Sequence, residues 1–235
     1  NPPAKPIHHV WRRLKAQKVL RLHDIENEKM LADHIAGLAL AHKESDAAVL
    51  IFARTINLVR DVSKQLTNAK KGGAPTVKAQ LLTGTMRGYE RERLIASDPV
   101  FARFMPASDR SSRVTPAEGA VFLVCTSAGE VGVNLCGDHM VCDLSTFDSM
   151  AQRFGRVNRF GDHAESRIDV VYARDITDTK SKAKKRIPEL DARRRRTLDL
   201  LEQLNHDASP LALEKLDISD RVAAFAPEPP IMPAT

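Results

Sequence analysis

The residues best suited to chemistry stand in one short run, residues 152–159, which reads Gln-Arg-Phe-Gly-Arg-Val-Asn-Arg. Arg156 and Arg159 are three positions apart, so on a helix both side chains would point to one side. Gly155 has no side chain and would let another backbone or a phosphate approach closely. Two guanidinium groups on a rigid helix could grip the γ-phosphate of a nucleotide, and an arginine finger of this kind accelerates phosphoryl transfer about a thousandfold or more. We therefore expect Arg156 and Arg159 to be catalytic; the alternative is a solvated basic helix face.

A second run, residues 126–135, directly follows the apolar stretch 120–125 and reads Thr-Ser-Ala-Gly-Glu-Val-Gly-Val-Asn-Leu. Hydroxyl groups and free backbone N–H groups at a strand-to-helix turn are good ligands for phosphate. The candidates for contact with a nucleic-acid backbone are Thr126 and Ser127. The candidates for binding a nucleotide are Gly132, Asn134 and Gln152. An asparagine can bond a ribose hydroxyl but carries no charge, and the alternative is an ordinary strand–turn–helix connection.

Two shorter turns carry a weaker signal of the same kind. Arg54 and Thr55 follow the apolar run 47–53, and Thr83 and Gly84 follow the run 77–82. We expect these four residues to contact a nucleic-acid backbone. For each of them alone, ordinary loop chemistry is an equally good explanation.

These turns must be positioned by the elements between them. The apolar runs 47–53, 77–82, 120–125, 139–144 and 168–172 are typical of strands buried on both faces. Helical spacing or composition indicates helices at 27–42, 56–68, 88–96, 147–158 and 188–204, whereas 99–119 resembles a surface insertion. Strands that alternate with helices predict an open parallel α/β sheet, which binds ligands beyond the carboxyl ends of its strands.

Length and composition bound the remaining possibilities. The chain has 235 residues, 43% of them hydrophobic, and a net charge of +6 that mildly favours an anionic partner. Its three cysteines form no C-x-x-C pair, so we expect no metal site and a reducing, cytoplasmic compartment. No apolar run approaches the roughly 20 residues that span a bilayer. We divide the chain into a basic lead-in (1–22), the α/β domain (23–178), a basic helical extension (179–224) and a Pro-rich linker or tail (225–235).

The run 152–159 fits the pattern Q-R-x-G-R-x-x-R, which resembles motif VI of superfamily 2 helicases, and the run 126–135 resembles their motif V. The combination is most similar to the CRISPR-associated helicase–nucleases of type I systems, with Phe154 and Asn134 as departures from the usual residues. The resemblance implies a C-terminal RecA-like lobe with helices on both faces of its sheet. The sequence has neither a P-loop nor a D-E-x-H or D-E-x-D box. By resemblance both belong to a first lobe, which would hold most of ATP and its Mg²⁺.

The same resemblance implies a motor that loads on single-stranded DNA, moves by hydrolysing ATP and serves a CRISPR surveillance complex. A separate nuclease domain of the same full-length chain would degrade the DNA. RNA stays open as the track. The alternatives are a Swi/Snf-like or DEAD-box-like translocase lobe, and a non-catalytic module that kept the fold to bind nucleic acid or protein. The ends of the chain resemble cuts made inside a longer protein.

Overall fold

The computed structural model describes residues 5–68, 77–110, 112–174 and 188–228. In these residues one sheet has the strand order β1-β6-β5-β2-β4-β3, and every pair is parallel. The strands are listed here in chain order: β1 (Lys18–Ile25), β2 (Ala48–Phe52), β3 (Lys78–Leu82), β4 (Val121–Cys125), β5 (His139–Asp143) and β6 (Ser166–Ala173). The open parallel α/β sheet expected from the apolar runs is confirmed.

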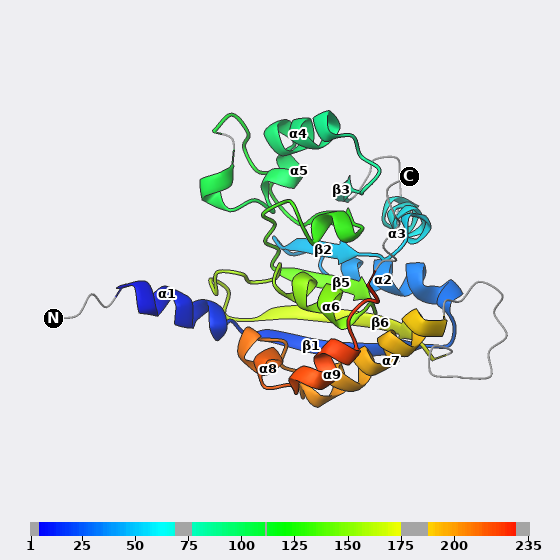
Figure 1. Cartoon of the computed structure of the whole chain (residues 1–235). Coiled ribbons are helices and arrows are strands. Elements are labelled where there is room, and N and C mark those ends of the chain that lie inside the picture. Colours follow the sequence, from blue (N-terminus) through cyan, green and yellow to red (C-terminus); the bar gives the residue numbers. More distant parts are fainter. Residues whose placement is uncertain (1–4, 69–76, 111, 175–187, 229–235) are drawn as a thin grey trace, which may run out of the picture.

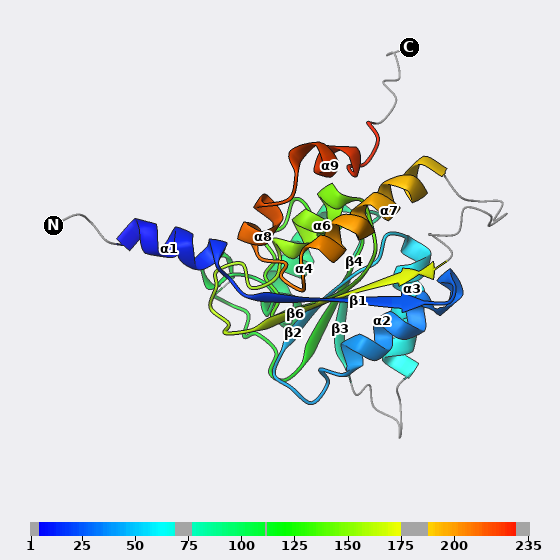
Figure 2. The ribbon, with the colours of Figure 1, turned by 90° about the horizontal axis from the view of Figure 1, so that it is seen from below.

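Helices cover both faces of this sheet (Figures 1 and 2). The helices α2 (Leu31–Leu40) and α3 (Ile56–Asn68) pack on one face, where Ile51, Val124 and Val141 join their apolar residues in one core cluster. The other face carries α6 (Phe147–Phe154) and α7 (Pro188–Gln203), with α4 (Gly88–Ser97) and α5 (Pro99–Ala102) toward the β3 edge. Residues of β2 and β4 are fully buried because both faces are covered.

The edge strand β1 and the preceding helix α1 (Lys5–Leu14) were not expected from the sequence, which indicated only a basic lead-in before residue 23. Strand β1 pairs with β6 along its whole length. Its sequence mixes apolar with charged residues because it lies at an edge, where burial alternates irregularly between buried and exposed positions. An edge strand therefore lacks the continuous apolar run that identifies the central strands.

The expected surface insertion at 99–119 is wrong for its first part. Residues 99–102 form α5, and Phe101 and Phe104 are completely buried in the core. A short 3-10 turn, η2 (Ala107–Asp109), follows. The prolines and serines after residue 105 dominate the composition of this segment, and they concealed the short apolar cluster before them.

The C-terminal helices α7 and α8 (Pro210–Glu214) contribute to the same core as the sheet, and α9 (Ile218–Ala223) is flanked by the core residues Leu216 and Ala224. Leu198 and Leu201 of α7 and Leu204 just after it are buried, as the helical stripe predicted. Arg193 and Arg196 both donate to the Ala223 carbonyl, at 2.6 and 3.1 Å, so these two arginines join α7 to the end of α9. The predicted boundary at 178/179 lies outside the described residues. None of the described helices is both long and apolar enough to cross a membrane.

Candidate nucleotide and nucleic-acid site

The turns after β2, β3 and β4, which carry the candidates for contact with a nucleic-acid backbone, all lie at the carboxyl ends of the strands. Phe52 of β2 pairs with Cys125 of β4 and Cys142 of β5, and Leu82 of β3 also pairs with Cys125. Four parallel strands thus end at the same level, so the loops that follow them are neighbours. Polar residues in these loops face the region where parallel α/β sheets bind ligands.

The turns after β3 and β4 are joined by hydrogen bonds around Thr126. Its backbone N–H donates to the Leu82 carbonyl at 3.1 Å, and its hydroxyl accepts the N–H groups of Gly84 at 3.2 Å and Ala128 at 3.4 Å. The Thr126 hydroxyl proton remains free to be donated outward, since the oxygen acts as acceptor in both bonds. Gly84 and Ser127 are exposed beside it. Thr83 is mostly buried, and its hydroxyl lies 3.0 Å from that of Thr85.

Arg156 and Arg159 stand on a turn and not on a helix, which corrects the predicted helix 147–158. Helix α6 ends at Phe154 with Gly155 as its C-cap. Val157 is buried and forms an isolated parallel bridge with Gly137, and Asn158 has a left-handed φ of 43°. The bridge and the left-handed residue prevent a further helical turn, because an α-helix needs right-handed φ values throughout.

Both arginines of this turn contact the loop after β4, and so the two runs singled out in the sequence meet. Arg156 donates to the Glu130 carbonyl, and Arg159 donates to the side-chain oxygen of Asn134. The Asn134 amide in turn donates to Asp109 at 2.5 Å. Arg156 is half-buried and Arg159 is exposed. Burial and then the neighbouring Arg159 lower the pKa of Arg156 below its ordinary value, so a bound anion would relieve the repulsion between the two charges.

The other two candidates of the nucleotide group lie close to this turn. Gln152 is exposed on the last turn of α6. Gly132 is exposed in the loop after β4, where its φ of 85° is a conformation that side chains rarely adopt. Two adjacent segments therefore carry the five nucleotide candidates: the loop after β4 carries Gly132 and Asn134, and the end of α6 with the turn after it carries Gln152, Arg156 and Arg159. We name the segment 155–159 the arginine turn.

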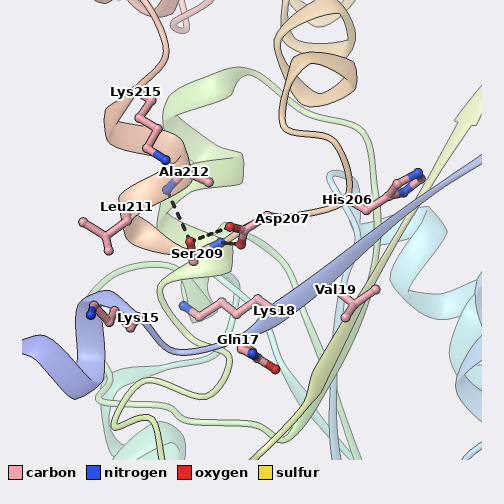
Figure 3. A pocket seen from close by; sticks show the side chains of 10 residues that line it. All are labelled: Lys15, Gln17, Lys18, Val19, His206, Asp207, Ser209, Leu211, Ala212 and Lys215. Carbon is pink, nitrogen blue, oxygen red and sulfur yellow. Dashed lines mark hydrogen bonds between the residues drawn. The ribbon is translucent and has the colours of Figure 1, made fainter.

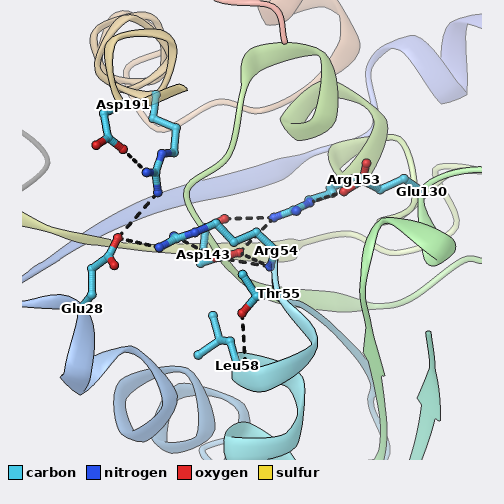
Figure 4. A network of polar contacts seen from close by, with 9 residues as sticks. Glu28, Arg54, Thr55, Leu58, Glu130, Asp143, Arg153 and Asp191 are labelled. Carbon is cyan, nitrogen blue, oxygen red and sulfur yellow. Dashed lines mark hydrogen bonds and ion pairs between the residues drawn. The ribbon is translucent and has the colours of Figure 1, made fainter. Parts of the chain in front are cut away.

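Beneath the arginine turn lies a buried ionic network, drawn in Figure 4. Arg153 is 1% exposed and donates to the Glu130 carboxylate at 2.7 Å and the Asp143 carbonyl at 2.9 Å. Burial by itself would lower the pKa of Arg153, but Asp143, Cys142 and Glu130 outweigh it and raise that pKa. Sequence reasoning gave Arg153 no role. The signal available was an arginine inside a helix whose neighbours Met150 and Phe154 are core residues.

Arg54 extends this network and does not reach the arginine turn. It donates to the Asp143 carboxylate at 3.0 Å and to Glu28 at 2.5 Å, and its side chain is 23% exposed. Glu28 also lies 3.7 Å from Arg194 of α7. The predicted phosphate contact at Arg54 would compete with these two carboxylates. The neighbouring Thr55 is exposed, and its hydroxyl accepts the Leu58 N–H at 3.2 Å at the start of α3.

A family model described as the C-terminal part of the CRISPR-associated nuclease/helicase Cas3 matches residues 45–162, about half of the chain. Among solved structures, T. fusca Cas3-ADP is similar with 18% identity and a TM-score of 0.60, covering 88% of this chain and 25% of that one. A second T. fusca Cas3 structure has 18% identity and a TM-score of 0.61, with coverages of 84% and 23%.

The T. fusca Cas3-ATP structure has 16% identity and a TM-score of 0.58, with coverages of 84% and 23%. At these identities the likeness is one of fold, and the fold is the RecA-like lobe expected from the motifs. The chain spans about a quarter of the length of these structures. No curated protein matched the sequence.

Proposed function

The chain belongs to the family of Cas3-like C-terminal domains and is the C-terminal lobe of a superfamily 2 helicase, and we propose that it works as the second half of an ATP-driven DNA motor. In this proposal ATP is held between two lobes. The first lobe holds most of the nucleotide, and this lobe supplies the arginine turn. Hydrolysis then alters the contact between the lobes and moves them along the strand.

One observation carries the proposal: two arginines share a short turn whose backbone is held by buried contacts and whose last residue, Arg159, is exposed to solvent. Phe154 and Val157 are fully buried on either side of Gly155, and the Gly137 backbone bonds to Arg156 and Asn158 at 2.8 and 3.0 Å. At the exposed end of the turn, Arg159 has the neutral Asn134 as its side-chain partner within the described residues. Guanidinium groups held in this way would stabilise the negative charge that builds up on a transferring phosphoryl group.

The strand would follow the turns after β3 and β4. The hydroxyls of Thr126 and Ser127 offer neutral donors to phosphate oxygens, a kind of contact that positions a strand without reading its sequence. A motor that moves along any sequence needs contacts of this kind. Single-stranded DNA is the proposed track, in keeping with the family.

For the full-length protein we propose cytoplasmic action with a CRISPR surveillance complex and a nuclease domain on the same chain. In the described residues no group of three His, Cys, Asp or Glu is placed to hold a metal ion. The proposal accordingly gives this lobe contacts with the nucleotide phosphates and no direct part in holding Mg²⁺.

The test is the DNA-stimulated ATPase of the full-length protein with Arg156→Ala. We expect kcat to fall about a thousandfold, the size typical of a lost arginine finger. Arg60→Ala is the matched control, since Arg60 is an exposed arginine on α3. Wild-type kcat in Arg156→Ala would reject the motor and favour a non-catalytic binding module. A degenerate P-loop in the first lobe would point the same way, and stimulation by double-stranded DNA or RNA in place of single strands would favour a Swi/Snf-like or DEAD-box-like motor.

A further inference from the structure

A pocket of about 400 Å³ lies at the amino end of β1, where α1 leads into this strand (Figure 3). Its walls come from the α1–β1 junction and from the segment that joins α7 to α8. Lys15, Lys18 and Lys215 line it, together with His206, Asp207 and Ser209. A water molecule occupies about 30 Å³ in the liquid, so the space exceeds what a phosphate group and several waters need.

The charge in this pocket is unbalanced. Asp207 is its one carboxylate, and the Ser209 backbone N–H and hydroxyl already bond to it at 2.8 and 3.1 Å. Within the part of the chain that the structure describes, neither Lys15 nor Lys215 has a carboxylate at ion-pair distance. The nearest charge-related contact of Lys15 is the Trp11 ring, 5.4 Å from its ammonium nitrogen. Three ammonium groups thus face one carboxylate.

Lys18 is the most informative of the three lysines because it is buried, with 3% of its surface exposed. Its ammonium group has three N–H donors, and among the described residues one acceptor is found for them, the Phe154 carbonyl at 2.8 Å. Burial lowers the pKa of Lys18 to about 8, against the opposing effects of Cys136 and Asp207. A buried ammonium with spare donors beside an open space is costly unless something with acceptor oxygens enters that space.

We propose that this pocket is a second anion site that takes a phosphate group, with Lys18 at its base and Lys15 and Lys215 at its mouth. Lysine binds phosphate as a point charge and needs no fixed geometry, which suits two long side chains on opposite walls. Figure 3 shows Lys15 and Lys18 entering from the α1–β1 side and Lys215 from α8. The phosphate can belong to a nucleic-acid strand, a source that rests on the proposed function, or to a free phosphate compound.

The pocket is connected to the arginine turn and the helix end before it through two hydrogen bonds: Lys18 donates to the Phe154 carbonyl at 2.8 Å, and Asn158 donates to the Gln17 carbonyl at 3.3 Å. The Phe154 carbonyl that Lys18 holds is the last of α6, two residues before Arg156. A phosphate on Lys18 would keep this lysine charged and the bond in place. Occupation of the pocket would therefore favour the conformation of α6 in which the arginine turn is seen.

The test uses the full-length protein with Lys15→Gln and Lys215→Gln combined; both side chains are exposed, so the fold should survive. Binding of a 20-residue oligo-dT is measured without nucleotide over a range of salt. Single strands release about 0.7 counterion per phosphate contact, so losing two contacts should make the salt slope shallower by roughly 1.4. Lys29→Gln is the control, because Lys29 is exposed and lies after β1 in the chain, whereas the pocket lies at the start of this strand. Among the described residues Lys29 forms no ion pair.

The second arm is thermal unfolding of the same proteins with inorganic phosphate, the ionic strength being held constant with chloride. A shallower slope with oligo-dT identifies a strand phosphate, whereas a phosphate-dependent rise in the melting temperature that the double variant loses identifies a free one. If the double variant matches the wild type in both the salt slope and the phosphate-dependent melting temperature, the proposal that this pocket binds phosphate is overturned. Neither arm needs ATP hydrolysis, so a negative result for the pocket does not bear on the ATPase test of Arg156. If instead the ATPase test fails, the experiment with inorganic phosphate still tests the pocket.

Discussion

Arg153 and Arg159 lie in the same eight-residue run and yet sit in opposite environments. Arg153 is 1% exposed, and its donors go to Glu130 and Asp143, both buried. Arg159 is exposed, and within the described residues its side chain donates to the neutral oxygen of Asn134. Gly155 therefore separates two arginines of one run, a buried one before it and an exposed one after it.

The contrast shows how to tell a structural arginine from a functional one. A guanidinium group has five donors, and a folded protein satisfies them when the group is buried. Where carboxylates of the same chain have used the donors, as at Arg153 and largely at Arg54, little is left for a ligand. Where the donors face solvent, an anion from outside can be bound. The arginine turn meets this second condition.

The largest effect on stability is expected for Arg153→Met, which keeps the bulk of the buried side chain but removes its charge. Glu130 would stay buried without its cationic partner, while Asp143 would keep only Arg54, and breaking a buried ion pair costs about 3–5 kcal/mol. We expect the free energy of unfolding of the chain, measured with urea, to fall by that amount. Arg60→Met is the exposed control and should change it by less than about 0.5 kcal/mol. Equal stability of the two variants would show that the network does not hold the fold.

Asn158, in the arginine turn, gives the next largest effect. It is 1% exposed, its side-chain amide donates to the Gln17 and His163 carbonyls at 3.3 and 2.9 Å, and its φ is 43°. Asn158→Ala should lower the free energy of unfolding by about 1–3 kcal/mol, because both of these hydrogen bonds are lost. Asn158→Gly accepts the left-handed backbone more easily and should destabilise the chain less. If alanine proves no worse than glycine, backbone conformation has no part in holding the turn.

The smallest expected effect concerns His42, a half-buried ring with another histidine and an arginine beside it. His42 stacks on His139 with the ring centres 4.3 Å apart, and Arg167 lies 3.2 Å from its Nε2 atom. Burial first, then His139 and Arg167, lower the pKa of His42 to about 4.

The folded state thus binds this proton less readily than the unfolded chain, so its contribution to stability is complete above pH about 6.5 and is lost as the pH falls toward 4. Urea unfolding at pH 7 and pH 5 measures the loss, and His42→Gln should make it smaller. An unchanged pH dependence in His42→Gln would assign the loss to other groups.

Much of the fold could be predicted because the central strands are buried on both faces, which forces the apolar runs seen at 47–53 and 120–125. Strand β1 could not, because an edge strand tolerates Arg21 and Asp24 on exposed positions. The meeting of the runs 126–135 and 152–159 does not follow from the strand ends alone, because the second run stands at the end of α6, where the Gly137 backbone bonds to Arg156 and Asn158. The burial of Arg153 could not be predicted either, because its acceptors Glu130 and Asp143 lie 23 and 10 residues away in sequence.

The candidate site shows the same limit. The sequence located the turns, but the end of α6 at Phe154 depends on contacts of Val157 with Gly137 and of Asn158 with Gln17. Gln17 lies 141 residues before Asn158, in the segment that carried no recognisable pattern. Tertiary contacts of this kind override local helix propensity.

The claim that Arg159 serves a nucleotide while Arg153 serves the fold is tested most directly by measuring kcat and the melting temperature of the full-length protein with Arg159→Ala. If Arg159 contacts a bound nucleotide, the DNA-stimulated kcat falls about a thousandfold. The melting temperature should then stay within about 2 °C of wild type, because an exposed arginine contributes little to stability. A wild-type kcat, or a fall in kcat only in proportion to a lost melting temperature, would contradict the account.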